Sequence, residues 1–133
     1  MYQQIVLIGH LGKDPNPRMT PSGASVTTFP LATSKTFKSD SGEVITQTVW
    51  WSISTFGKLA ENCSAFLQKG SKVMVVGEVK GDEKGHPRMW TGSDNAVHAS
   101  FEVTAGKVIF LSPKDEAKAA VEAPAGDDDA VPF

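Results

Sequence analysis

Two aromatic residues alternate with serines along one stretch that has the composition of a β-strand, residues 44–55. Alternate residues of a strand share a face. One face then carries Trp50, Ser52, Ser54 and Phe56, and the other carries Val49, Trp51, Ile53 and Thr55. Flat rings among small hydroxyl groups suit a wet surface on which nucleic-acid bases stack, at about 1–3 kcal/mol per base. This strand alone is equally compatible with ordinary core roles for the two aromatics, whereas the second face reads as barrel interior or subunit contact.

Two further aromatic residues lie in polar surroundings and favour stacking. Phe37 is flanked by Lys35 and Lys38, and Trp90 lies beside Arg88 in a long polar segment. Further basic residues are spread along the same segments: Lys13, Arg18, Lys58, Lys69, Lys72, Lys80 and Lys84. Each cation alone is more simply a solvated surface charge. Their interleaving with exposed aromatics indicates a groove that follows a nucleic-acid backbone.

The residue types that would support catalysis or metal binding do not form a recognisable pattern. His10, His86 and His98 lie in different segments without metal-ligand spacing, and there is no glycine-rich phosphate loop or nucleophile elbow. Cys63 is the only cysteine, which excludes a disulfide within one chain and a thiolate-based metal site. We therefore expect no catalytic residues, no metal, no cofactor and no enzymatic activity.

Five strands and one helix are needed to position these side chains. The expected strands cover residues 3–9, 25–35, 44–55, 72–80 and 97–103, the last extended or closed by 107–111. Residues 58–69 change to a helical period, with Leu59, Cys63, Phe66 and Leu67 on one face and Gly70 as the stop. Turn residues predict loops over 12–24 and 82–95, and Pro30 must occupy a position that donates no ladder hydrogen bond.

This order of elements predicts an all-β fold. Antiparallel strands of this number usually remove their free edges by closing into a barrel. We expect a five-stranded antiparallel Greek-key barrel of the OB type, with one short α-helix between the third and fourth strands and a disordered acidic tail.

Charge divides the chain into a body and a tail. Residues 1–111 contain 11 Lys and Arg against 9 Asp and Glu, whereas residues 112–133 contain 2 against 6. Residues 1–111 are expected to form the nucleic-acid-binding domain. Residues 112–126, rich in Ala, Pro and charge, are expected to form a flexible linker with a reach of about 20–23 Å. Because no signal peptide or membrane span is recognisable, we expect a soluble, cytoplasmic, nucleoid-associated protein.

The last seven residues combine negative charge with an aromatic carboxyl terminus. The candidate docking residues are Asp127, Asp128, Asp129, Val131, Pro132 and Phe133. A partner would need an apolar pocket for the ring and basic residues for the carboxylates. From these residues alone, docking and simple solubilisation are equally compatible, and the aspartates could also compete weakly with DNA for the basic groove.

Several longer motifs resemble the bacterial single-stranded DNA-binding proteins. They are GHLGKDPNPRMTPSGASV, LATSKTF, QTVWWSISTFGKLAENCSAFLQKGSKVMVVGEV and, at the far end, DDDAVPF. The resemblance covers residues 3–111 and, separately, the acidic tip. Three features depart from the family pattern: bulky Trp51, a longer loop between Gly77 and Trp90, and a short linker followed by a tip that carries Ala130-Val131 before Pro-Phe.

The resemblance implies an OB-fold protein that binds single-stranded DNA without sequence preference in replication, recombination and repair. It places base stacking on Phe37, Trp50, Phe56 and Trp90. Phosphate contacts are expected from Lys13, Arg18, Lys35, Lys38, Lys58, Lys69, Lys72, Lys80 and Arg88. It also implies a homotetramer and recruitment of partner enzymes through residues 127–133. An OB-fold RNA-binding module remains an alternative because stacking does not read the 2′-hydroxyl, whereas an accessory replication-restart subunit is disfavoured by the acidic tip.

Overall fold

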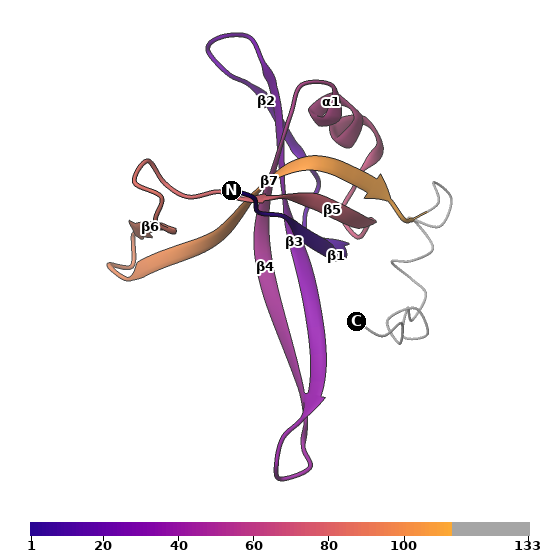
Figure 1. The fold of residues 1–133 in the computed structure, drawn as a ribbon, viewed down its shortest axis with the longest axis vertical. Coiled ribbons are helices and arrows are strands. Elements are labelled where there is room, and N and C mark those ends of the chain that lie inside the picture. Colours follow the sequence, from indigo (N-terminus) through magenta and orange to yellow (C-terminus); the bar gives the residue numbers. More distant parts are fainter. Residues whose placement is uncertain (113–133) are drawn as a thin grey trace.

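A computed structural model describes residues 1–112 and contains seven strands and one helix (Figure 1). The elements are β1 (Ile5–Leu11), β2 (Asn16–Met19), β3 (Ser25–Lys38), β4 (Val44–Phe56), α1 (Gly57–Phe66), β5 (Lys72–Val79), β6 (Arg88–Thr91) and β7 (Val97–Phe110). The expectations for most of the linker (all but Ser112) and for the whole acidic tip lie outside the described residues.

Five of the strands close into a barrel in the order β1-β5-β7-β4-β3. Closure occurs between β1 and β3 through the pairs His10↔Ala32 and Leu11↔Leu31. The expected OB architecture is confirmed, with one refinement: β4 and β7 run parallel over Trp51–Ser54 and Phe101–Thr104. The other pairings that close the barrel are antiparallel.

The barrel interior is filled by fully buried branched and aromatic side chains, including Phe29, Leu31, Ile53, Val73, Val75 and Val103. Helix α1 contributes Ala60 and Cys63 to the buried set. The Thr27 hydroxyl donates to the Ala60 carbonyl at 2.8 Å, which ties the helix to β3. This hydrogen bond matters because a buried polar group without a partner is costly.

Three strand pairs continue beyond the barrel and give the molecule its extended shape (Figure 1). The β3–β4 ribbon is paired from Val26↔Phe56 to Lys38↔Val44, so its distal half projects into solvent. Strand β6 pairs with the first part of β7 in a second ribbon, and β2 pairs with the first part of β3 in a third. The surfaces available to a long ligand therefore extend well beyond the barrel wall.

Two expected loops contain short strands. Residues 12–24 include β2, and residues 82–95 include β6. Both strands are four residues long and fully exposed, so neither has the apolar alternation by which a strand is recognised. Trp90 consequently belongs to a strand rather than to a loop.

The helix also differs from expectation. It ends at Phe66 instead of Lys69, because Leu67 is already extended, at φ −93° and ψ 153°. Phe66 is 63% exposed and therefore does not share the buried face of Cys63 and Leu67. Its ring lies instead 6.3 Å from that of Phe110.

Candidate nucleic-acid interface

The outward face of β4 carries two exposed aromatic side chains. Trp50 is 55% exposed and Phe56 is 45% exposed, whereas Ile53 and Thr55 on the inward face are fully buried. Six residues of extended strand separate Trp50 from Phe56, a distance of about 20 Å. The outward alternation expected for Trp50, Ser52, Ser54 and Phe56 is therefore present, and the core interpretation of the two aromatics is excluded for this chain in the described conformation.

Small polar side chains cover the sheet between these two rings. The strand register aligns Asn16, Thr28, Ser54 and Thr104 in one row across four strands. The neighbouring row contains Pro30, Ser52 and Glu102. A concave surface beside Trp50 is lined in part by Lys13, Asn16, Thr28, Ser52 and Ser100. Flat rings at each end and hydroxyl groups between them form a surface on which bases could stack and hydrogen-bond.

Trp90 lies in a cluster of stacked and paired side chains on the β6–β7 ribbon. It pairs with His98 across the ribbon, and the two rings are stacked with centroids 5.6 Å apart and planes at 25°. The Arg88 guanidinium lies 5.6 Å from the Trp90 centroid, over the ring. It also donates to Glu102 Oε2 at 3.2 Å. Glu102 follows Ser52 in register, so the Trp90 cluster adjoins the outward face of β4.

The turn before β7 holds His98 in place. His98 Nε2 and Asp94 Oδ1 are 3.1 Å apart, and Asp94 Oδ1 also accepts the Ala96 N–H at 3.1 Å. The Ala96 hydrogen bond, followed by that with His98, lowers the pKa of the Asp94 carboxyl below its ordinary value. The carboxylate is thus charged in the neutral range and orients the imidazole.

His98, Asp94 and Glu102 belong to this cluster but are not among the site residues expected from the sequence. The alternation of residues 97–103 places His98 and Glu102 on one face of a strand and is the sequence signal that could have identified them. The missing information was the pairing of β6 with β7, which brings Arg88 and Trp90 onto that face.

Phe37 is exposed at 42% but does not share the pleat face of Trp50. Its register partner is Ile45, and the same face of the ribbon carries Lys35 and Gln47. The Lys35 ammonium lies 5.9 Å from the Phe37 ring centroid. The structure therefore brings Trp50, Phe56 and Trp90 onto connected outward surfaces and leaves Phe37 on the other side of the β3–β4 ribbon, paired with a cation.

Trp51 faces inward, as its parity predicts. It is half-buried, packs against the core, and lies 5.2 Å from the Phe101 ring. Its indole N–H donates to Thr33 Oγ1 at 2.9 Å. These contacts make Trp51 a packing residue of the barrel, although the Phe101 ring beside it is 60% exposed.

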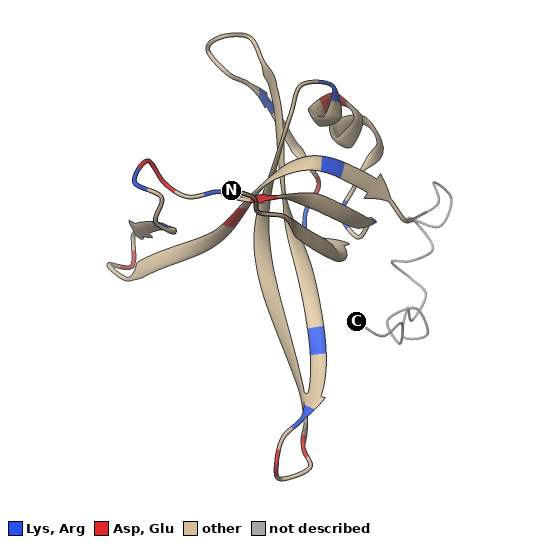
Figure 2. Cartoon of the chain, viewed as in Figure 1, with Lys and Arg blue, Asp and Glu red and all other residues tan. Residues whose placement is uncertain are grey.

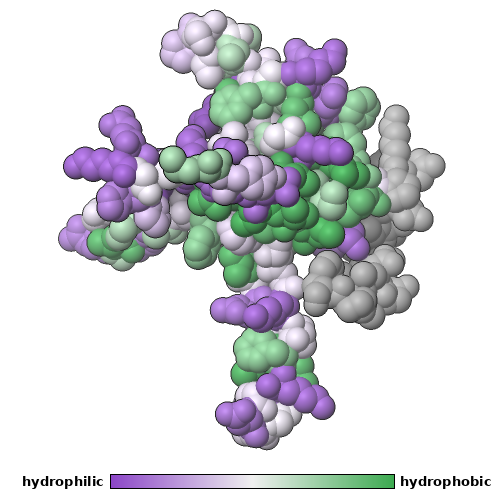
Figure 3. Space-filling view, in the orientation of Figure 1, coloured by the Kyte–Doolittle hydropathy of each residue, from purple (hydrophilic) through white to green (hydrophobic). Residues whose placement is uncertain are grey.

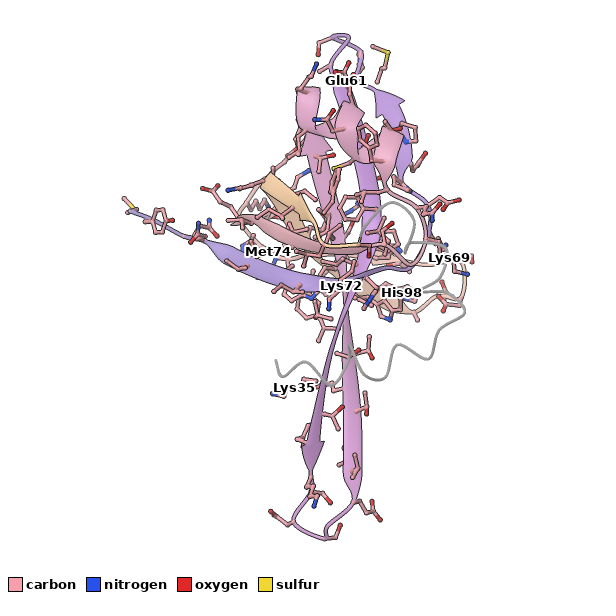
Figure 4. All side chains as sticks on the ribbon, turned by 90° about the vertical axis from the view of Figure 1, so that its right-hand side faces the viewer. Lys35, Glu61, Lys69, Lys72, Met74 and His98 are labelled. Carbon is pink, nitrogen blue, oxygen red and sulfur yellow. The ribbon has the colours of Figure 1, made fainter. Side chains whose placement is uncertain are left out.

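The expected phosphate-binding cations are spread over the surface and not gathered in one patch (Figure 2). Lys35 lies far out along the β3–β4 ribbon, whereas Lys69 and Lys72 lie at the level of the barrel (Figure 4). Arg18 follows Val26 and Phe56 in register, so a cation borders the Phe56 end of the surface. Eight of the nine are exposed (Lys13, Arg18, Lys35, Lys38, Lys58, Lys69, Lys80 and Arg88), and Lys72 is half-buried.

Within residues 1–112, no group of three or more His, Cys, Asp or Glu side chains is arranged to hold a metal ion. No helix in this part of the chain is long and apolar enough to cross a membrane. The docking residues Asp127, Asp128, Asp129, Val131, Pro132 and Phe133 lie outside the described residues.

The model of the single-strand binding protein family matches this chain over residues 2–111. Among curated proteins, "Single-stranded DNA-binding protein 2" of Listeria innocua is 39% identical over 123 residues, which is 70% of its length. "Single-stranded DNA-binding protein 1" of Chlorobaculum tepidum is 48% identical over 77 residues, 58% of this chain. A "Single-stranded DNA-binding protein" of Neisseria meningitidis is 31% identical over 113 residues, 85% of this chain.

The matched segments span 48% of the Chlorobaculum protein and 62% of the Neisseria protein, so these relatives are considerably longer than the regions they share with this chain. Among solved structures, a Plasmodium falciparum SSB complex with ssDNA superposes with a TM-score of 0.69 at 25% identity, covering 84% of this chain and 97% of that one. A deletion mutant of the Thermus aquaticus single-stranded DNA binding protein gives 0.65 at 26% identity, covering 82% and 50%.

Proposed function

The chain belongs to the single-strand binding protein family, and from that premise we propose that it binds single-stranded DNA without sequence preference. One observation carries the proposal. Trp50 and Phe56 are exposed on the same outward face of β4, with only small polar side chains between them, and Trp90 adjoins that face through Arg88 and Glu102.

The binding mechanism we propose divides the work between rings and cations. Bases stack on the indole and phenyl faces, which read no sequence because every base has a π face. The nine proposed phosphate-binding residues neutralise the strand and release its counterions. Phe37 and Lys35, on the far side of the β3–β4 ribbon, would contact the strand as it passes around that ribbon.

The proposal extends to assembly and recruitment. We propose that the chain forms a homotetramer and that residues 127–133 recruit replication, recombination and repair proteins, with residues 112–126 as the tether. Support for assembly comes from β1, whose residues Ile5 to Gly9 have β5 as their strand partner within residues 1–112. The other edge of that segment could pair with a second copy. Support for recruitment comes from the negative charge of Asp127, Asp128 and Asp129 and from the aromatic ring of Phe133.

The decisive experiment is a titration of the protein with oligo(dT) at two salt concentrations, followed by tryptophan emission. Stacking on Trp50 and Trp90 should quench the emission. Higher salt should weaken binding, because the release of counterions into a more concentrated salt solution gains less entropy. Oligo(U) in parallel measures the preference for DNA over RNA. Unchanged emission and no detectable binding at saturating oligo(dT) would refute the proposal.

A further inference from the structure

The benzene part of the Trp50 indole lies directly against the backbone of Gly12, in the segment between β1 and β2. A β-carbon added to Gly12 would lie 2.8 Å from Trp50 Cη2 and closer still to Cζ3. Real β-carbons essentially never approach another heavy atom within 3.0 Å. Only glycine at position 12 therefore leaves room for Trp50 in its present orientation.

Gly12 is itself firmly held. Its N–H donates to the Pro30 carbonyl at 3.0 Å, and the preceding Leu11 is 2% exposed and donates to the Ser71 carbonyl. Three residues earlier, within β1, a β-carbon on Gly9 would collide with the Ala32 carbonyl. The end of β1 therefore lies very close to β3. The support beneath the Trp50 ring is fixed backbone, not a mobile side chain.

The opposite strand is equally bare at this place. Trp50 is in register with Ala32 of β3, whose side chain is a single methyl group. The indole can therefore lie across Ala32 toward Gly12 while 55% of its surface remains exposed. In Figure 3 hydrophobic residues gather over the barrel, from which the more hydrophilic ribbons project.

We infer that Gly12 is a positioning residue for DNA binding, which holds the Trp50 ring ready to stack on a base by having no side chain. The inference rests on the proposed function. A ring that is already oriented loses little freedom when a base stacks on it, and preorganisation of this kind strengthens binding.

The test is Gly12→Ala. Gly12 is not among the glycines with positive φ, so alanine is compatible with its backbone and the substitution acts through the Trp50 ring. We expect the ring to be displaced and the affinity for oligo(dT) to fall roughly 3- to 10-fold, which is at or below the lower end of the range of about 5- to 150-fold expected for Trp50→Ala. Gly106→Ala is the matched control, since the nearest atom to its added carbon is Val76 O at 3.8 Å.

Two double variants separate positioning from general damage. Adding Gly12→Ala to Trp50→Ala should cause no further loss of affinity. Adding it to Trp50→Phe should also be harmless, because phenylalanine lacks the Cζ3 and Cη2 atoms that the new methyl group would meet. Thermal unfolding of each variant identifies any loss of fold, and the Trp50→Phe background keeps the test available if Gly12→Ala alone folds poorly.

The outcomes distinguish this inference from the proposed function. If Trp50→Ala leaves DNA affinity unchanged, stacking on Trp50 is wrong and the proposed function loses its main support. If Trp50→Ala weakens binding but Gly12→Ala does not, only the positioning role is overturned. An equal loss from Gly12→Ala in the wild-type, Trp50→Ala and Trp50→Phe backgrounds would likewise overturn it. A loss of DNA affinity from Gly12→Ala that is confined to the wild-type background would establish the positioning role of Gly12.

Discussion

Adjacent tryptophans can have opposite roles when they lie on a strand, and Trp50 and Trp51 show this at the scale of single residues. Trp50 is 55% exposed, whereas Trp51 packs on the core and donates its indole N–H to Thr33. The two side chains differ because consecutive residues of a strand point to opposite faces. Their contributions to stability and to DNA binding should therefore separate.

We expect Trp51→Ala to lower the free energy of unfolding by about 3–5 kcal/mol, because it removes a large packed side chain and its hydrogen bond. Trp50→Ala should change this free energy by less than about 1 kcal/mol, since surface substitutions are usually small. Urea denaturation followed by circular dichroism measures both. Equal destabilisation by the two variants would contradict the assignment of faces.

Cys63 offers a second test at this scale. Burial raises the pKa of its thiol to about 11, against a contrary but smaller effect of a hydrogen bond with Thr55. The ordinary value is 9.0, so the thiol favours the folded state below pH 9 and this contribution is lost as the pH rises toward 11. At pH 7.5 a thiol reagent should label the folded protein very slowly and the urea-unfolded protein fast. Rapid labelling of the folded protein would show that the thiol is accessible.

At the scale of elements, the β6–β7 ribbon combines strand pairing with side-chain contacts on its own surface. Within residues 1–112 its strand β6 pairs only with β7. Trp90 is 44% exposed and rests on His98, which Asp94 orients from the turn. Gly92 allows this arrangement, since a β-carbon there would lie 2.8 Å from both Asp94 Oδ1 and His98 Nε2.

We expect His98→Ala to weaken oligo(dT) binding roughly 2- to 5-fold by removing the ring on which Trp90 stacks. His98→Phe should restore most of the affinity, because it keeps a flat ring, although it loses the hydrogen bond with Asp94. Emission of Trp90 in a Trp50→Phe, Trp51→Phe background reports the ring directly. Val97→Ala, on the opposite face and 65% exposed, is the control. Identical affinities for the alanine and wild-type proteins would rule out this support role.

At the scale of the whole molecule, the barrel has features that a second copy could cover. The edge of β1 from Ile5 to Gly9 is accompanied by Val6, which is 52% exposed, and by Tyr2, which is 85% exposed. Exposed strand edges promote pairing with another chain, and closed symmetric assemblies are the usual result.

We therefore predict a homotetramer, to be measured by light scattering at micromolar concentration. Val6→Lys should shift the mass toward smaller species by placing a charge at the proposed contact, whereas Val44→Lys, far out on the β3–β4 ribbon, should not. A monomeric mass for the wild-type protein would refute the prediction.

The acidic tip gives the second prediction at this scale. Removing residues 127–133 should abolish capture of replication and repair enzymes while leaving oligo(dT) affinity unchanged or slightly higher at low salt, because competing carboxylates are gone. Phe133→Ala should reproduce the partner defect without the DNA effect, since it retains all three aspartates. Pull-downs beside DNA titrations at two salt concentrations test both. A truncated protein that keeps its partners but loses DNA binding would reverse the proposed division.

The sequence by itself determined the barrel and the outward face of β4. The strands are recognisable from local composition and alternation, and the parity of Trp50, Ser52, Ser54 and Phe56 follows from the pleat of a single strand. The place of Cys63 on one face of the helix and the order of the five barrel strands along the chain likewise follow from local sequence patterns. The motifs that resemble the family cover residues 3–111, and the family model matches residues 2–111. Both rest on the same local information.

Only the tertiary structure decided which distant residues meet. Strand β6 has no apolar alternation, and its existence depends on pairing with β7, which brings Trp90 onto His98 and Arg88 onto Glu102. Phe37 was grouped with Trp50 by residue type, but the register of β3 with β4 places them on opposite faces. The contact of Trp50 with Gly12 follows from barrel closure, which joins segments 38 positions apart in the chain. Such contacts depend on register and closure, and no local pattern encodes them.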